Sequence, residues 1–503
     1  MKKASTSVYR LIQAMTPSEK RYFQQYAGRT QSRHLQLFRI LNHQPRYDED
    51  AARRQMPGKP GRGHFAVLKR QLMEHLLDCL GQYHRDKSPA ERLKRKLHAA
   101  RILQEKGLFS LMEQELKASR KLLGQYQLNR HWPELLALER SLVERGLSTM
   151  KRPEPLRQWQ AEWQAGLDAL QEEGRFAYYS LHIAHQHYKK IQLAGAGDAE
   201  ALQALVESEN FQAGRNSPQL RCRMDYFRAL STYHFMQRQA RQALQANAEL
   251  LRLFEDNAQL MELYPQHYLA ALNNYLIDHF QLRQWPELEE GLKKLKGLPA
   301  RPLFRKASGA SEKAFEQSAM LELNMLLAKQ ELGLALTVLP EIESGLRQYG
   351  RRIAAHNQQA LWYLMSYICF RQSRPDKGLE LLNELLQARQ KGMLEELNRF
   401  ANLLQLLLHY ELGNYELLPY LITSVRRQHQ GLKPAYRSEQ LLFDCLRRLL
   451  GSADKAQQKN ALNRLSESIE NEELKVKEAR FFEYLDLSRW PAIRASENKN
   501  GDK

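Results

Sequence analysis

The chain lacks the long apolar stretches that would carry it into a membrane. No segment reaches the roughly 18 consecutive apolar residues that a spanning helix needs, and residues 1–10 lack the apolar core of a secretory signal. Cysteine is scarce, and the four residues are far apart, each within a helical pattern: Cys79, Cys222, Cys369 and Cys445. Buried free thiols in a reducing compartment explain them better than disulfides do. We therefore expect a cytoplasmic protein with no membrane insertion.

Signals for strands and for catalysis are also missing. No sustained alternation of Val, Ile or Thr is bounded by turns, and no Gly-x-Ser-x-Gly, His-Glu-x-x-His or dinucleotide-binding pattern occurs. His182, His185 and His187 lie close together, but no Cys or acidic residue accompanies them at a spacing that would complete a zinc site. Acidic pairs such as Glu172-Glu173 are adjacent on a helix and point in different directions. We expect neither an enzyme nor a bound metal or cofactor.

A short pattern recurs along the chain: His or Cys, an aromatic residue, a turn about five residues later and a new amphipathic segment. The copies are His187-Tyr188, His234-Phe235, His279-Phe280, Cys369-Phe370 and His409-Tyr410. Successive aromatic residues are 40 to 47 positions apart, except for one interval of 90 that spans two periods with a degenerate copy between them. Recurrence at such a period indicates stacked repeats, in which each unit buries its apolar face against its neighbours.

Helix-start signals follow several copies. The string Trp-Pro-Glu-Leu occurs at 132–135 and at 285–288, and Pro375 follows Phe370 closely. Proline is tolerated in the first turn because its missing N–H would be unpaired there, and Glu favours the positive end of the helix dipole.

Over roughly residues 90–490 this pattern resembles the tetratricopeptide-like (TPR-like) family, with Gly413-Asn414-Tyr415-Glu416 as the closest local match. The resemblance implies an α-solenoid of helix-turn-helix repeats. The period here exceeds the roughly 34 residues typical of that family, so its peptide-clamp positions are unmatched and no ligand residue is carried over.

These observations predict an all-α fold in three parts. A small basic helical domain is expected over 1–88, a TPR-like α-solenoid over 89–492 and a disordered tail over 493–503. The aromatic residues of four copies are expected at equivalent buried positions between paired helices: Phe235, Phe280, Phe370 and Tyr410.

Positive charge is concentrated at the start of the chain. Residues 1–106 carry +14 of the total net charge of +19. The sequence Thr16-Pro-Ser-Glu19 forms a capping box that opens one helix, short helices are predicted over 34–43 and 48–55, and a longer one runs through 68–80. This order is compatible with a helix-turn-helix or winged-helix domain and also with an N-terminal cap of the solenoid, which we slightly favour.

The glycine-rich stretch 57–63 and the cations near it are candidates for phosphate contact. Backbone N–H groups at a helix N-terminus can cradle a phosphate, although the stretch is not a Walker A loop. The candidate nucleic-acid-binding residues are Lys59, Arg62, Lys69, Arg70, Lys94, Arg95 and Lys96. The alternative is a flexible connector that its charges keep in solution.

Two functions are compatible with these features. The first is a non-enzymatic cytoplasmic adaptor or scaffold that binds a protein or peptide partner in the solenoid groove, for which the sequence suggests Arg228, Tyr233, Asn273, Asn274 and Tyr363. The second is a nucleic-acid-associated regulator whose basic N-terminal domain contacts DNA or RNA while the solenoid senses a partner. The family resemblance favours the first function, and the charge asymmetry favours the second.

Overall fold

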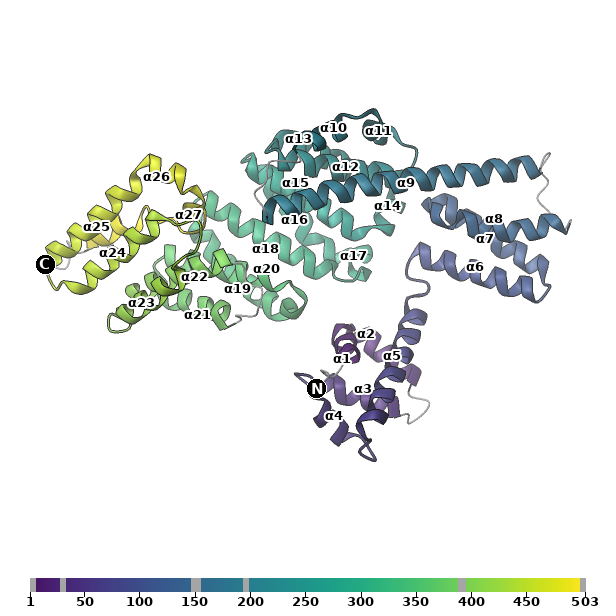
Figure 1. The fold of residues 1–503 in the computed structure, drawn as a ribbon, viewed down its shortest axis with the longest axis horizontal. Helices are drawn as coiled ribbons and strands as arrows, with labels where there is room; N and C mark the ends of the chain where they lie inside the picture. The colour runs from purple at the N-terminus through teal and green to yellow at the C-terminus, as the bar shows by residue number, and fades with distance from the viewer. Residues whose placement is uncertain (1–5, 28–32, 146–154, 193–198, 388–394, 498–503) are drawn as a thin grey trace. The chain divides into compact units, whose positions relative to one another are not determined.

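The computed structural model describes residues 6–27, 33–145, 155–192, 199–387 and 395–497 (Figure 1). Within those ranges the regular structure is entirely helical, which confirms the predicted all-α class. None of the helices in the described ranges combines the length and the apolar character needed to cross a bilayer. The chain forms two compact units: unit 1 comprises Met1–Met236 and Glu249–Tyr264, and unit 2 comprises Gln237–Ala248 and Pro265–Lys503.

The first five helices enclose a hydrophobic cluster of their own, which includes Phe23, Phe38 and Phe65. They are α1 (Ser7–Ala14), α2 (Pro17–Ala27), α3 (Arg33–His43), α4 (Glu49–Gln55) and α5 (Arg62–His84). The predicted capping box of α2 is confirmed, because the Thr16 N–H donates to Glu19 Oε2 at 2.7 Å and the Glu19 N–H donates to Thr16 Oγ1 at 3.3 Å.

The remaining helices of unit 1 begin where Ser88 caps α6, its Oγ accepting from the Glu91 N–H at 3.2 Å. Arg120 ties three of them together, since it donates to Glu139 on α8 at 3.0 Å and to Glu162 on α9 at 2.9 Å. These helices are α6 (Pro89–Glu105), α7 (Phe109–Tyr126), α8 (Trp132–Glu144), α9 (Pro155–Gln192), α10 (Ala199–Glu207), α11 (Glu209–Gln212), α12 (Leu220–Met236) and α14 (Ala258–Leu263). The short 3-10 helices of unit 1 are η1 (Asn129–His131) and η2 (Ala213–Asn216).

Unit 2 covers most of the segment in which repeats are predicted. Consecutive helices pack as pairs, and α15, α18, α20 and α22 also pack against one another in that order. Its helices are α15 (Pro265–Gln281), α16 (Trp285–Gly297), α17 (Pro302–Lys306), α18 (Ala310–Ala328), α19 (Leu332–Tyr349), α20 (Ala355–Arg371), α21 (Pro375–Gln387), α22 (Glu395–Glu411), α23 (Leu418–His429), α24 (Arg437–Gly451), α25 (Lys455–Glu470), α26 (Glu472–Lys477), α27 (Ala479–Tyr484) and α28 (Trp490–Glu497). The 3-10 helices η3 (Leu298–Ala300) and η4 (Gly350–Arg352) lie between them, and α13 (Ala240–Asp256) is divided between the two units.

The recurring His-aromatic pattern marks one way of ending a helix. After His279-Phe280, Arg283 takes a left-handed φ of 56°, the Gln284 N–H donates to the His279 carbonyl at 3.0 Å, and the Arg283 N–H donates to the Phe280 carbonyl at 3.1 Å. These two bonds and the left-handed residue define a Schellman cap. The His279 ring adds a side-chain bond of 2.7 Å between Nδ1 and Gln284 Oε1.

The same cap closes three later helices. Its left-handed residues are Gln330, Ser373 and Gly413, followed by Glu331, Arg374 and Asn414, whose N–H groups donate to the carbonyls of Leu326, Cys369 and His409. The cap at Leu326-Leu327 lies 47 residues after His279 and 43 before Cys369. It falls where the double interval predicted a degenerate copy, with leucines in place of the marker residues.

The expectation of equivalent buried aromatic rings is wrong in part. Phe370 is 7% exposed, but Phe235 is 38% exposed, and Phe280 and Tyr410 are half-buried. These residues stand at the last turns of their helices, where burial depends on what the next helix covers. The Tyr188 side chain lies outside the described residues.

Two predicted boundaries also differ from those in the structure. The helix expected to begin at Tyr415 begins at Leu418, because residues 414–417 complete the turn. The tail expected to be disordered from residue 493 is helical in α28 as far as Glu497, and Ala495 is buried there. Residues 498–503 lie outside the described part of the chain.

The four cysteines are free and buried, as expected. Burial raises the pKa of the Cys79 and Cys369 thiols to about 11 and that of the Cys222 and Cys445 thiols to about 12. All four therefore remain protonated near neutral pH, which makes them weak nucleophiles.

A buried acid pairs α13 with α15 in unit 2. The Asn247 amide donates from Nδ2 to Asp278 Oδ2 at 2.7 Å, and Asp278 is 1% exposed. Burial penalises the carboxylate and raises the pKa of Asp278 to about 7.

Helix packing in unit 2 predicts opposite effects for two glycines of α19. A Cβ atom on Gly345 would overlap the ring of Phe315, whereas one on Gly333 would meet open space. Gly345→Ala should cost about 1–3 kcal/mol through overpacking, and Gly333→Ala should be neutral or stabilise the helix by up to about 1 kcal/mol. Thermal unfolding followed by circular dichroism measures both, and equal shifts for the two variants would contradict this packing.

The raised pKa of Asp278 predicts that the free energy of unfolding falls as pH rises. Its folded-state pKa of about 7 lies above its ordinary value of 3.8, so the folded chain binds the extra proton and loses stability as pH rises between those values. Asp278→Asn should raise the melting temperature by several degrees at pH 8 and leave it nearly unchanged at pH 4. Melting curves at both pH values test this, and an unaltered pH dependence in the variant would show that Asp278 is not its source.

Candidate partner-binding groove

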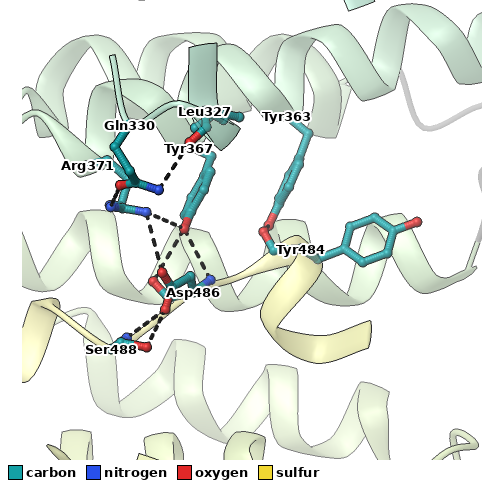
Figure 2. A network of polar contacts seen from close by, with 8 residues as sticks. All are labelled: Leu327, Gln330, Tyr363, Tyr367, Arg371, Tyr484, Asp486 and Ser488. Carbon is teal, nitrogen blue, oxygen red and sulfur yellow. Dashed lines mark hydrogen bonds and ion pairs between the residues drawn. The ribbon is translucent and has the colours of Figure 1, made fainter. Parts of the chain in front are cut away.

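In unit 2, α20 and α22 hold an extended piece of chain between them. Tyr363 and Tyr367 are one turn apart on α20, so they lie on the same side of the helix, with ring planes 4° apart and centroids 6.4 Å apart. Figure 2 shows both hydroxyls pointing at the segment that links α27 to α28, which runs from Tyr484 past Asp486 to Ser488.

The two hydroxyls bind the backbone of this segment. Tyr363 donates to the Tyr484 carbonyl at 2.8 Å. The Tyr367 hydroxyl accepts from the Asp486 N–H at 3.1 Å and donates to the Asp486 carbonyl at 3.3 Å. An extended segment away from a sheet has no partner of its own for these groups, and α20 supplies one through side chains.

Arg371 completes the network from the next turn of α20. Its Nη1 donates to the Tyr367 hydroxyl at 3.1 Å and lies 3.7 Å from Asp486 Oδ2, and its Nη2 donates to Gln330 Oε1 at 3.0 Å. The side chain is only 9% exposed, so its charge needs these partners. Asp486 Oδ1 in turn accepts from the Ser488 N–H at 2.9 Å, which shapes the segment as it leaves the helix.

Apolar contacts hold the segment on the opposite side. Leu485 and Leu487 are fully buried in the core of unit 2, and the Tyr484 ring stacks on Phe400 of α22 with centroids 4.7 Å apart. Alternate residues therefore enter the core while the backbone between them bonds to α20, as expected of an extended strand.

Burial also keeps the hydroxyls in the right protonation state. It raises the pKa of Tyr363 well above 10, and it raises the pKa of Tyr367 although Arg371 opposes the shift. Both hydroxyls therefore remain hydrogen-bond donors across the physiological range.

Beside the bound segment an open cavity of about 630 Å³ extends over α15, α18 and α20. Its walls on these helices are mainly apolar, and Arg480, Phe482 and Glu483 border it from the C-terminal side. The helix residues include Phe280, Met320, Asn324, Ala328, Ala360 and Leu364. Its size and lining suit the side chains of a bound peptide. We call this cavity the α18–α20 groove.

Of the predicted partner-binding residues, the structure places only Tyr363 at this groove, and its hydroxyl is bonded to the chain itself. Asn274 is exposed on α15 and Asn273 is half-buried there, and neither lines the groove. Tyr233 and Arg228 belong to unit 1.

Tyr233 is 8% exposed, so its role is in the core rather than in partner contact. Arg228 donates to Asp225 at 3.0 Å and neutralises that buried carboxylate, whose pKa burial nevertheless raises. Sequence reasoning left Arg371 out of the site. The spacing of Tyr363, Tyr367 and Arg371 at four-residue steps places them on one helix face and was the signal that could have revealed it.

Lys69, one of the predicted nucleic-acid-binding residues, is not exposed. Its side chain is buried, with Nζ 2.5 Å from Glu49 Oε2 and 3.0 Å from the Tyr47 hydroxyl. Lys69 therefore joins α5 to α4 inside the first five helices. Reversing its charge would place two carboxylates together and should destabilise this region, so Lys69 is not available for the predicted contact with nucleic acid.

Most of the other predicted cations are paired with carboxylates. Arg70 lies 4.0 Å from Glu74, Lys94 lies 2.8 Å from Glu91, Arg95 lies 3.0 Å from Asp86 and Lys96 lies 3.0 Å from Glu115. Lys59 and Arg62 are exposed, and neither has an ion-pair partner in the described chain. Glu74 and Glu91 lie one helical turn from their partners, whereas Asp86 precedes α6 and Glu115 comes from α7.

Comparisons with protein-family models, with curated proteins and with solved structures find no match. Within the described residues, no group of three or more His, Cys, Asp and Glu side chains could hold a metal ion. The geometry of the groove is therefore the main guide to function.

Tyr367→Phe tests the hydrogen bonds of the segment. The change keeps the ring but removes the partner of the Asp486 N–H, so exchange of that amide with solvent should accelerate by about tenfold, as expected for a lost bond of about 1–2 kcal/mol. Tyr363→Phe is the matched control, because it frees only the Tyr484 carbonyl and should leave the Asp486 amide protected. Hydrogen-exchange mass spectrometry of residues 484–489 measures both, and equal protection in both variants would refute the role of Tyr367.

Proposed function

We propose that this chain is a non-enzymatic cytoplasmic adaptor, built as a TPR-like α-solenoid, that binds an extended segment of a protein partner in the α18–α20 groove. The observation that carries the proposal is that the same face already holds an extended segment through the Tyr363 and Tyr367 hydroxyls. The open groove lies directly beside it on the same helices.

The repeat architecture is supported by the shared helix ending. The Schellman caps after His279, Leu326, Cys369 and His409 recur at 40 to 47 residues, and the helices that they close, α15, α18, α20 and α22, pack in sequence. In a helical solenoid one helix of each pair lines a continuous binding surface. The free, buried cysteines support placement in a reducing compartment such as the cytoplasm.

The groove's chemistry favours a partner segment with apolar side chains. Of the charged groups at its border, Arg480 is paired, because it bonds to Glu396 through Nε at 2.5 Å and through Nη2 at 2.6 Å, whereas Glu483 is exposed. Asn324 is half-buried among the apolar lining residues. Its Nδ2 donates to the Met320 carbonyl at 2.7 Å, and its Oδ1 can accept from a peptide N–H.

Contact of a basic domain over residues 1–88 with DNA or RNA remains the alternative, and the +14 charge of residues 1–106 supports it. The ion pairs of Arg70, Lys94, Arg95 and Lys96 reduce the field that this region offers to a phosphate backbone. We therefore favour the adaptor.

Site-specific photocrosslinking in the native cell tests the groove. A benzoylphenylalanine residue at Ala328, which is exposed and lines the groove, should crosslink one dominant protein. The same residue at Ala456, which is exposed on α25 and does not line the groove, should not crosslink it. Mass spectrometry of the products identifies the partner.

The purified partner then allows a matched binding test. Leu364→Glu places a charge in the groove and should weaken binding by about tenfold or more. Leu334→Glu makes the same change at an exposed leucine of α19 outside the groove and should leave binding intact. Equal binding by both variants, with both folded by circular dichroism, would refute the proposed groove.

A further inference from the structure

A second cavity, of about 700 Å³, lies where α23, the loop 430–436 and α24 meet. Four exposed cations from these three elements line it: Arg426, Arg427, Lys433 and Arg447. We call it the cationic cavity. It shares no lining residue with the α18–α20 groove and does not depend on the proposed function.

The carboxylate of Glu439 lines the cavity but already accepts hydrogen bonds from two side chains. Glu439 accepts from Arg399 Nε at 2.6 Å and from His429 Nδ1 at 2.9 Å, and all three side chains are nine-tenths or more buried. Asn402 Nδ2 lies 3.2 Å from His429 Nε2, so the two ring nitrogens of His429 contact Asn402 and Glu439. This buried network forms the floor of the cavity and occupies the Glu439 carboxylate.

Arg399 leaves one donor group available at that floor. Its Nη1 donates to the Pro434 carbonyl at 2.6 Å, and its guanidinium lies over the Tyr436 ring at 4.5 Å from the centroid. Nη2 has no acceptor in the described part of the chain and is not among the fully buried atoms, so it is accessible in the cavity that Arg399 lines. It can therefore donate to an acceptor that a ligand supplies.

The four exposed cations also have no carboxylate partner in the described ranges. Arg426 and Arg427 stand in the last turn of α23, where a helix dipole favours positive charge. That explanation does not extend to Lys433 in the loop or to Arg447 on α24. Like charges brought together from three elements repel one another unless an anion lies between them.

We infer that the cationic cavity binds a small anion with two adjacent phosphate groups, such as inorganic pyrophosphate or the diphosphate of a nucleotide. Arginine forks match phosphate oxygens in pairs, and several convergent cations are needed to offset so dense a negative charge. The volume lies in the usual range for a small-molecule site. The cations converge on one hollow rather than following a stripe, which favours a compact anion over a nucleic-acid strand.

Isothermal titration calorimetry on the full chain tests this inference with pyrophosphate, ADP and a single-stranded RNA oligonucleotide. Pyrophosphate and ADP should each bind saturably with one site per chain. Equal affinities would assign recognition to the phosphates alone, and tighter binding of ADP would add contacts from the nucleoside. Either result supports the site.

A pair of double variants separates the cavity from the general charge of the chain. Arg427→Glu with Arg447→Glu should weaken pyrophosphate binding by about tenfold or more. Arg437→Glu with Arg448→Glu changes the net charge equally on exposed arginines of α24 that do not line the cavity, and should preserve binding. Melting curves confirm that both variants fold.

Three results would overturn the inference. They are no saturable binding of pyrophosphate or ADP by the wild type, equal weakening in the two double variants, or binding of the RNA oligonucleotide alone. The last would assign the cations to a macromolecular polyanion.

Discussion

The last carbonyl groups of an α-helix have no partner within the helix, and in unit 2 the chain satisfies them by turning through one left-handed residue. Arg283, Gln330, Ser373 and Gly413 each make this turn, and each next helix then starts within a few residues. Such tight reversals let alternate helices pack directly against one another. The face formed by α15, α18, α20 and α22 depends on this ending. The α18–α20 groove and the segment 484–488 that is bound beside it depend on it as well.

Unit 2 satisfies its buried polar groups across long sequence separations. The Tyr367 hydroxyl and Arg371 bond to Asp486, more than 110 residues later, while Arg399 and His429 share the carboxylate of Glu439. Each network fixes a non-helical segment against a helix, because a buried donor or acceptor without a partner would cost about 1–3 kcal/mol. The two cavities lie beside these fixed segments, so their walls are preorganised for a ligand.

Charge illustrates why local patterns overestimate a binding surface. Lys69 stands among the basic residues of the N-terminal region in sequence, yet Glu49 and Tyr47 enclose it in the fold. Arg426 and Arg427 are adjacent on α23, whereas Arg447 lies 20 residues after Arg427, on α24. Folding brings them to one cavity without an acid to neutralise them. The net charge includes every charged residue, whereas a ligand responds mainly to the cations that no carboxylate neutralises.

The sequence by itself determined the helical class, the capping box at Thr16 and Glu19, the proline helix starts and the period of the helix endings. All of these depend on residues within a few positions of one another, so local propensity and spacing suffice. Tertiary structure alone decided that Phe235 is exposed and that Tyr363 bonds to the chain's own C-terminal segment. It also decided which cations of the described chain have no carboxylate partner. Burial and pairing depend on groups dozens to more than a hundred residues away, and no local pattern specifies which distant side chain a helix face will meet.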